Sequence, residues 1–412
     1  MDVMIENKVV PKLRFREFEG IWTREKFKGL VKINQGLQIP ISERYTEEVD
    51  NSYFYITNEF LKAKSDKKYY IKNPNKSVLC DVDDILMTRT GNTGMVVTNV
   101  KGAFHNNFFK IAYPSTIDKD FLFYFLNLTN TQNTIKRLAG TSTIPDLNHS
   151  DFYRIDFPIT TLPEQQKIAS FLSAVDEKLQ QLTKKKELLE EYKKGVMQKI
   201  FSKELRFKDE FGNNYPDWEE KKLGEIGEFK TSSVDKLIKE DEKMVSLVNY
   251  MNVYNHQNIT NEITKGLMQV SAKEKQIETS NLKKGDILFT PSSETPSDIG
   301  HSIVIFEDLH NTLYSYHLMR FRPIINLDIL YSHYFCNIPS VLRQITRFAT
   351  GSTRFTISVG SFSKLIIQLP SLEEQQKIAN FLSSLDSKIE LVSTQIEKTK
   401  AFKKGLLQQM FV

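Results

Sequence analysis

The chain contains the sequence Glu-Gln-Gln-Lys-Ile-Ala at residues 164–169 and again, 210 residues later, at residues 374–379. The identity extends beyond this hexapeptide. Of the 38 positions from 164 to 201, 17 carry the same amino acid as the position 210 residues downstream, and no gap is needed. An internal repeat of this length is the strongest signal of organisation that a sequence can carry. The chain therefore contains two copies of one architecture.

Shorter matches mark the beginning of each copy. The triplet Leu13-Arg14-Phe15 recurs at residues 205–207, and each triplet is followed by a tryptophan, Trp22 or Trp218. These matches place the start of the second copy close to residue 204. Each copy should therefore begin with its own globular domain and end with the shared segment.

The region between these landmarks has diverged. Residues 84–88 correspond to residues 286–290, but residues 36–79 have no convincing counterpart in residues 231–282. We therefore predict two variable globular domains that alternate with two shared helices. The predicted segments are 1–163 (first domain), 164–203 (central helix), 204–373 (second domain) and 374–412 (distal helix).

The shared segments have the spacing of a coiled-coil seam, in which apolar residues alternate at intervals of four and three. The seam positions of the first segment are Ile168, Leu172, Val175, Leu179, Leu182, Lys186, Leu189, Lys193, Val196 and Ile200. Those of the second are Ile378, Leu382, Leu385, Ile389, Val392, Ile396, Thr399, Lys403, Leu406 and Met410. Two rods of about 57 Å, each with one seam, should pack as an antiparallel pair. The alternative is an ordinary amphipathic helix in each domain core. The lysines on the seam indicate either imperfect packing or a further partner.

The variable domains have short β-like runs followed by helical stretches. The runs lie at 77–79, 85–88, 95–98, 108–113, 286–290, 303–306 and 318–321, and the helical stretches at 119–138 and 328–348. This pattern predicts a mixed α/β (α+β) fold for each domain. The whole chain should be two globular target-binding domains with a pseudo-two-fold internal repeat, separated by the paired helices.

Composition indicates a globular chain with two cores and excludes several classes of protein. The chain has 412 residues, of which 40% are hydrophobic and 26% charged, and its net charge is +5. This weakly basic balance is compatible with a polyanionic partner. Cys80 and Cys336 form no Cys-x-x-Cys pair, which argues against a disulfide framework or a cysteine zinc site. Residues 1–10 do not resemble a secretory signal, and no apolar run is long enough to cross a bilayer. We expect a cytoplasmic protein.

Polar loops with nearby basic residues are the candidate DNA contacts. They lie at 89–94, 140–143, 291–301 and 351–354 and recur at matching positions of the two copies. Such loops can approach a phosphate backbone, and Arg and Asn can bind base edges through paired hydrogen bonds. Plain turn chemistry is the alternative for any single loop. The candidate contacts are Arg89, Asn92, Thr93, Thr141 and Thr143 in the first copy and Ser292, Ser293, Ser352 and Arg354 in the second.

No catalytic motif is present. The sequence lacks a phosphate-binding loop, a dinucleotide fingerprint, the Asn-Pro-Pro-aromatic motif of adenine methyltransferases and a His-Glu-x-x-His metal motif. Residues 216–221 have the letters of a nuclease site, but its carboxylates are crowded on one segment. His310 and His317 are better explained as surface or packing residues than as metal ligands. We predict no catalytic residue, no metal site and no cofactor bound by this chain.

The repeated order of motifs resembles the specificity subunit of type I restriction-modification systems. These motifs are Leu-Arg-Phe before Trp, the strand-like Gly-Asp-Ile-Leu-Phe-Thr at 285–290, Thr-Ile-Pro-Asp-Leu-Asn at 143–148 and the Glu-Gln-Gln-Lys-Ile-Ala helices. The resemblance covers essentially the whole chain. The second copy departs from it at 353–358, Thr-Arg-Phe-Thr-Ile-Ser, so no specific role is carried over to Pro145, Asp146 or Asn148.

The resemblance implies a non-catalytic subunit that binds a bipartite, asymmetric site in double-stranded DNA, one half-site per domain. It also implies that the helices dock two methyltransferase (modification) subunits and that restriction/translocase subunits join for cleavage. S-adenosylmethionine, ATP and magnesium would then belong to those partners. The alternatives are an enzyme in its own right, for which the sequence holds no motif, and a coiled-coil protein-protein scaffold that does not read DNA.

Overall fold

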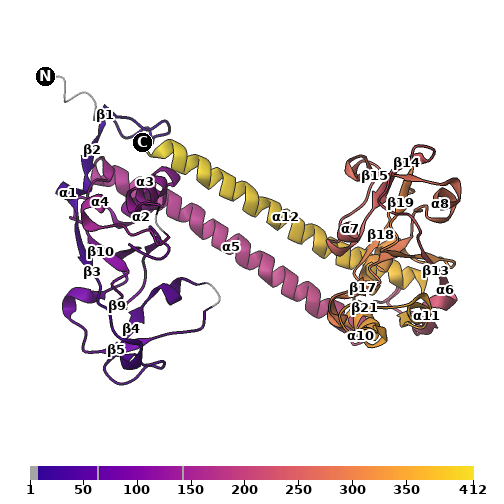
Figure 1. Cartoon of the computed structure of the whole chain (residues 1–412). Coiled ribbons are helices and arrows are strands. Elements are labelled where there is room, and N and C mark those ends of the chain that lie inside the picture. Colours follow the sequence, from indigo (N-terminus) through magenta and orange to yellow (C-terminus); the bar gives the residue numbers. More distant parts are fainter. Residues whose placement is uncertain (1–7, 63–64, 142) are drawn as a thin grey trace. The chain divides into compact units, whose positions relative to one another are not determined.

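The computed structural model describes residues 8–62, 65–141 and 143–412; the first residues, on which the exclusion of a signal peptide partly rests, lie outside them. The chain divides into two units, Met1–Thr183 with Thr394–Val412, and Lys184–Ser393. Each unit combines one globular domain with the start of one long helix and the end of the other (Figure 1). We call them the N-terminal and the C-terminal unit.

The two long helices are α5 (Leu162–Phe201) and α12 (Leu372–Met410). Every predicted seam position in both is buried or half-buried, which confirms the seam. Within each unit, the start of one helix lies against the end of the other. Lys403 Nζ lies 2.5 Å from Asp176 Oδ1 in the N-terminal unit, and Lys193 pairs with Asp386 in the C-terminal unit. The helices therefore pair in antiparallel fashion, and the seam lysines Lys193 and Lys403 are accommodated by equivalent ion pairs.

Each domain has a four-stranded antiparallel sheet of the same strand order. In the first domain the order is β3 (Lys32–Gln35), β10 (Phe108–Ala112), β7 (Ile85–Thr88) and β8 (Val96–Val97). In the second it is β13 (Gly227–Thr231), β20 (Met319–Pro323), β16 (Ile287–Phe289) and β18 (Ser302–Val304). Six predicted strands coincide with strands of these sheets to within one or two residues at each end. They are the runs at 85–88, 95–98, 108–113, 286–290, 303–306 and 318–321.

A second sheet in each domain is formed by the regions without sequence similarity. Its strands are β5 (Tyr70–Lys72), β4 (Ser52–Ile56), β9 (Gly102–Phe104) and β6 (Leu79–Cys80) in the first domain. They are β15 (Met268–Ala272), β14 (Lys243–Val248) and β19 (Thr312–Tyr314) in the second. The strands β4 and β14 correspond, because each is antiparallel to one neighbour and parallel to the other. Residues 36–79 therefore do have a structural counterpart, because an alternating pattern of burial constrains a strand without constraining its residue identities.

Smaller sheets and turns complete the domains. The strands are β1 (Lys8–Val9), β2 (Trp22–Lys26) and β11 (Asp156–Ile159), β12 (Glu219–Lys222) and β22 (Ile366–Leu369), and β17 (Ser292–Ser293) and β21 (Phe355–Thr356). The 3₁₀ turns are η1 (Ile41–Glu43), η2 (Asn58–Leu61), η3 (Lys76–Val78), η4 (Ile263–Gly266) and η5 (Pro296–Asp298). The run predicted as a strand at 77–79 is mostly η3.

The helical stretches predicted at 119–138 and 328–348 are each two helices rather than one. They are α2 (Lys119–Asn127) with α3 (Thr129–Ala139), and α9 (Ile329–Phe335) with α10 (Pro339–Phe348). Leu128 and Ile338 take extended backbone conformations at the breaks, and Pro339 cannot donate the hydrogen bond that a continuous helix needs. The remaining short helices are α1 (Phe27–Leu30), α4 (His149–Phe152), α6 (Leu223–Ile226), α7 (Tyr250–Tyr254), α8 (Glu274–Thr279) and α11 (Val359–Ser363).

The repeated hexapeptide connects each domain to its long helix. The buried Glu164 carboxylate accepts hydrogen bonds from Arg14 Nε (2.7 Å) and Trp22 Nε1 (3.1 Å). Gln165 Oε1 accepts a hydrogen bond from the backbone of Asp118, at the start of α2 (2.9 Å). The repeat is therefore strict here because each residue type supplies a particular buried hydrogen bond.

The second copy repeats this network atom by atom. Glu374 accepts hydrogen bonds from Arg206 Nη2 (2.7 Å) and Trp218 Nε1 (2.8 Å). Gln375 Oε1 accepts one from the backbone of Asp328, at the start of α9 (3.0 Å). The structure thus gives Trp218 a packing and anchoring role and leaves residues 216–221 without the arrangement of a nuclease site.

Candidate nucleic-acid interface

In each domain, two of the predicted loops meet. The loop that follows β7 contacts the segment that follows α3: Thr90 forms an antiparallel bridge with Asp146, and the backbone N–H of Leu147 donates to Arg89 O (2.9 Å). In the second domain, β17 pairs with β21, and the N–H of Ile357 donates to Pro291 O (2.9 Å). We call each meeting point the loop junction of its domain.

Arg89 is the central side chain of the first loop junction. Its Nη2 atom donates to Asp146 Oδ2 (2.6 Å), and its guanidinium carbon lies 5.8 Å from the centroid of the Phe109 ring. The Arg89 side chain is 20% exposed, and its Nε–H is buried without a hydrogen-bond partner. The junction therefore presents a fixed guanidinium and an accessible carboxylate, which together can donate to and accept from base edges.

The other candidates of the first domain divide into one half-buried residue and several exposed residues. The Thr93 hydroxyl lies 3.0 Å from Arg89 O and 2.8 Å from Pro145 O, so it holds the two loops together. Asn92 is exposed at the loop tip, in the left-handed region with φ 69°. Thr141 and Thr143 are also exposed, whereas Ser142 lies outside the described residues.

The second loop junction takes its arginine from the opposite loop. Arg354, which lies just before β21, donates through Nη2 to Ser292 Oγ (3.1 Å). Tyr250 OH donates to the Ser292 carbonyl oxygen (3.1 Å), and Ser293 Oγ lies 3.4 Å from Asp298. Ser292 and Ser293 are buried, while Arg354 is exposed. Ser352 is exposed as well.

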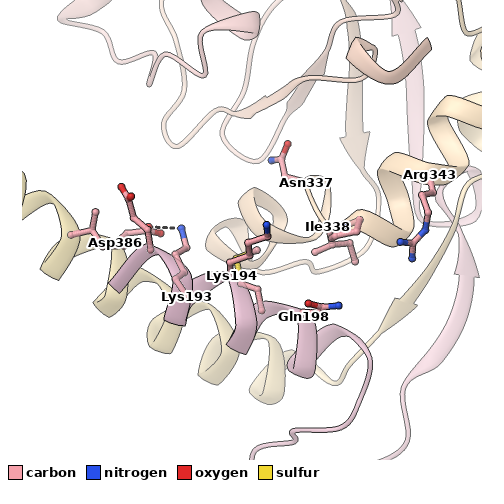
Figure 2. A pocket seen from close by; sticks show the side chains of 11 residues that line it. Lys193, Lys194, Gln198, Asn337, Ile338, Arg343 and Asp386 are labelled. Atoms are coloured by element: carbon pink, nitrogen blue, oxygen red, sulfur yellow. Dashed lines mark hydrogen bonds and ion pairs between the residues drawn. The ribbon is translucent and has the colours of Figure 1, made fainter. Parts of the chain in front are cut away.

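A separate cavity of about 680 Å³ lies in the C-terminal unit, beside the last turns of α5. Figure 2 shows the ion pair of Lys193 with Asp386 on one side and the side chains of Lys194 and Gln198 on α5. Arg343, from α10, lines the opposite wall. The sequence indicated either imperfect packing or a further partner at Lys186 and Lys193, and it did not predict this cavity.

The residues around this cavity recur in the N-terminal unit. Lys403 pairs with Asp176, and its ammonium lies 5.4 Å from the Tyr124 ring centroid, as that of Lys193 lies 5.3 Å from the Tyr334 ring centroid. The repeated surface consists of Asp176, Lys403, Lys404, Gln408 and Asn127 in one unit and of Asp386, Lys193, Lys194, Gln198 and Asn337 in the other. The second lysine and the glutamine are exposed in both units. We call these two sets the repeated surfaces.

The seam residues predicted as scaffold positions lie inside the helix pair. Ile168, Leu172 and Val175 belong to the core of the N-terminal unit, and Ile378 and Leu382 to that of the C-terminal unit. The others, Leu179, Leu182, Leu385, Ile389 and Val392, are buried or half-buried on the seam. Their contacts are therefore within the chain, and a partner protein would meet the exposed residues beside them.

Among residues 8–62, 65–141 and 143–412, no three His, Cys, Asp or Glu side chains are grouped to hold a metal ion. The same residues include no helix that is long and apolar enough to cross a membrane. Both cysteines are buried free thiols, and burial raises the pKa of Cys80 to about 11. A thiol with a raised pKa is a poor nucleophile at neutral pH.

Comparison with known proteins identifies one family. A family model described as the type I restriction modification DNA specificity domain matches residues 21–191 and again 215–401. The type I restriction enzyme MjaVIII specificity subunit of Methanocaldococcus jannaschii is 25% identical over 95% of this chain and 94% of its own length. The MjaIX specificity subunit of the same organism is 23% identical over 79% of this chain and 76% of its own length.

The solved structures agree on the fold. The S subunit of a type I restriction-modification system from M. genitalium has a TM-score of 0.59 at 18% identity and covers 98% of this chain and 99% of its own. The HsdS subunit of Thermoanaerobacter tengcongensis has a TM-score of 0.51 at 14% identity and covers 95% and 96%. The two segments that match the family model, 21–191 and 215–401, coincide with the two copies of the repeat.

Proposed function

Because this chain belongs to the family of type I restriction-modification DNA specificity domains, we propose that its two domains, residues 1–163 and 204–373, each read one half of a bipartite, asymmetric DNA site. The observation that carries this proposal is the pair of loop junctions. They occupy the same place in both domains, yet one has Arg89 beside a carboxylate and the other has Arg354 beside a hydroxyl. Different donors and acceptors on one backbone frame imply different base sequences.

In this proposal some residues of each junction contact DNA, and others hold those residues in position. Arg89, Asn92, Thr141 and Thr143 would contact the first half-site, with Arg354 and Ser352 at the second. Thr93, Ser292 and Ser293 would position those groups, because their hydroxyls lie against other protein atoms. The chain would carry no catalytic residue of its own, in keeping with a family of DNA-specificity domains rather than of enzymes.

The repeated surfaces support the docking of two identical partners. The ion pairs within the chain explain why Lys193 and Lys403 are both lysines. They do not explain why the exposed residues Lys194 and Lys404 are also identical in the two copies. A surface that is identical in two diverged copies is best explained by one partner that binds both. In a type I system, two methyltransferase subunits would fill these positions, and restriction/translocase subunits would join them in the cytoplasm.

A pair of helical glycines strengthens this argument. Gly195 in α5 and Gly405 in α12 follow the repeated Lys-Lys pair, and a Cβ atom built on either would meet nothing within 4 Å. Glycine inside a helix costs about 0.5–1 kcal/mol relative to alanine. Since packing within the chain does not require these glycines, we attribute them to the close approach of a partner backbone.

The test of DNA reading is a methylome of cells that express this chain with its methyltransferase subunit. We expect methylated adenines in a split, asymmetric motif only when this chain is present. If a complex forms but the methylation pattern is unchanged, the scaffold alternative is supported instead.

The test of docking is the association of the purified chain with the methyltransferase subunit, measured by calorimetry. Gly195→Leu and Gly405→Leu should each weaken binding at one site by about tenfold or more, since overpacking an interface costs about 1–3 kcal/mol. Ala401→Leu, also exposed on α12, is the matched control and should leave both sites unchanged. Unaltered binding by both glycine variants would place the partner elsewhere.

A further inference from the structure

At one end of the sheet β15-β14-β19, three segments of the C-terminal unit are held side by side by backbone hydrogen bonds. The N–H of Ser315 donates to Val248 O (3.0 Å), and that of Tyr316 donates to Val234 O (3.1 Å). Tyr250 then links this corner to the loop junction through its bond to Ser292 O. The corner therefore lies directly beside the arginine of that junction.

The corner contains a cavity of about 290 Å³, roughly ten times the volume of one water molecule in the liquid. Its lining residues are Lys236, Asn249, Tyr250, Met251, His317 and Arg354. Three of the six are basic, and they come from three different segments of the chain. The cavity is thus large enough for a hydrated phosphate group, and its walls supply donors to one.

The basic side chains of this cavity are not neutralised by neighbouring carboxylates. In the part of the chain that the structure describes, neither Lys236 nor Arg354 forms an ion pair, and Asp298, whose charge acts on Tyr250, lies 3.0 Å from His301 Nε2. The pKa of His317 is lowered, first by burial and then by the charges of Lys236 and Arg354. Cations that converge in this way repel one another unless an anion lies between them.

The first domain builds the same corner with different side chains. The N–H of His105 donates to Ile56 O (2.9 Å), that of Asn106 donates to Leu37 O (3.0 Å), and Asn58 Nδ2 donates to Thr90 O (3.2 Å). These bonds are the counterparts of those in the second domain. In place of Lys236, Tyr250, Met251, His317 and Arg354, the first domain has Ile39, Asn58, Glu59, Asn107 and Ile144. The cation at the first domain's corner, Arg44, is engaged within the chain, because it donates to Ile39 O through Nε (2.9 Å) and Nη2 (2.6 Å). The fold therefore does not need the basic side chains without an ion pair that line the cavity of the second domain, so their presence calls for a ligand.

We propose that this cavity binds one backbone phosphate of the DNA half-site read by the C-terminal domain, with Lys236 as its charged ligand beside the base-reading Arg354. The proposal rests on the proposed DNA-reading function. Lysine is a point charge suited to a phosphate, and phosphate contacts of this kind fix the position of a protein on the duplex. The first domain would engage its half-site without an equivalent contact.

The experiment uses the complex with the methyltransferase subunit and a duplex that carries the motif found in the methylome. Lys236→Ala should weaken binding about tenfold and reduce the slope of log affinity against log salt by about one, because one phosphate contact is lost. Lys236 is exposed, so its removal leaves the core intact. Lys239→Ala is the matched control, since Lys239 lies in the same loop but faces Asp235 (3.9 Å) and does not line the cavity.

A neutral methylphosphonate, placed at each backbone position of the second half-site in turn, identifies the phosphate. At one position the loss should equal that of Lys236→Ala, and the two changes together should cost no more than either alone. If the two losses add at every position, or if Lys236→Ala changes the methylated motif, the phosphate site is disproved while the proposed function stands. If the wild-type complex does not bind its motif, both fail.

Discussion

The two domains have the same strand order but differ in how they present an arginine. In the first domain Arg89 comes from the loop after β7 and is held by Asp146; in the second Arg354 comes from the segment before β21 and is held by Ser292. The positions that face these arginines have changed as well. The comparison indicates that the backbone frame is constant and that the side chains on its loops can be exchanged without disturbing the fold.

The connection between domain and helix shows the opposite behaviour. Glu164 and Glu374 accept hydrogen bonds from an arginine and a tryptophan in both units, and both carboxylates are buried. A buried carboxylate without its donors is costly, so neither partner can change alone. The parts of the molecule that must satisfy buried charge are therefore repeated, while the exposed loops have diverged.

The largest expected effect tests whether the connections are equivalent. Glu164→Ala and Glu374→Ala should each destabilise their own unit by about 3 kcal/mol, because each removes the carboxylate of an ion pair and leaves a buried indole N–H without an acceptor. The two tryptophans, Trp22 and Trp218, lie one in each domain, so urea unfolding followed by fluorescence in Trp218→Phe or Trp22→Phe backgrounds reports on one unit at a time. Exposed Glu373→Ala is the control, and a response in only one unit would break the equivalence.

The second prediction tests whether the loop junctions act separately. Arg89→Ala should alter recognition at one half-site and Arg354→Ala at the other, each by about 1–3 kcal/mol of discrimination. The methylome measures this directly as relaxed positions in one half of the motif. Arg154→Ala, in which an exposed arginine paired with Asp151 is removed, serves as control. Equal loss at both half-sites after either substitution would contradict the assignment.

The third prediction concerns His105, at whose position in the corner the second domain has Ser315. Burial, with a smaller contribution from Arg44, lowers the pKa of His105 from 6.5 to about 4. The unfolded chain therefore binds a proton below about pH 6.5 that the folded chain does not bind until about pH 4. Stability of the N-terminal unit is present above this window and is lost as the pH falls through it, by at most about 2 kcal/mol because the ring is partly solvated.

His105→Asn is the variant that tests this pH dependence. The asparagine amide oxygen can accept the hydrogen bond that His105 Nδ1 accepts from the N–H of Asn107 (3.1 Å). The second domain has Ser315 at the corresponding position, so its own acid sensitivity should come from other groups, including His333, whose pKa is also lowered by burial. Unfolding free energies between pH 4 and 7 should be less steep for the variant; an unchanged slope would remove His105 as the cause.

The smallest expected effect returns to a feature that both domains share despite different residues. Asn148 accepts a hydrogen bond from the N–H of Asp151 at the start of α4 (2.9 Å), and Ser358 accepts one from the N–H of Ser361 at the start of α11 (3.1 Å). Asn148→Ala and Ser358→Ala should each cost about 1 kcal/mol, measured by the same fluorescence method. A much larger loss of motif recognition than of stability would show that these residues also touch DNA.

The long helices, most strands of the central sheets and the number of domains followed from the sequence. The four-three spacing gives the seam because only that period keeps one face of a helix against its partner. The strands at 85–88 and 108–113 were recognisable because most of their residues are apolar and buried. The helix breaks before Thr129 and Pro339 were missed, since a hydrophobic period continues across them and only the extended backbone between the helices reveals the turn.

By itself, the sequence determined the duplication, the helix seam and the absence of catalytic motifs, because periodicity, identity and motif spacing are properties of the chain. Tertiary structure alone decided which loops meet, that Arg89 and Arg354 come from opposite loops, and that Lys236, His317 and Arg354 surround one cavity. These residues are separated by up to 118 positions, from 236 to 354. Long-range proximity depends on how strands pair, and strand pairing is set by burial and backbone hydrogen bonds over the whole domain rather than by any local pattern.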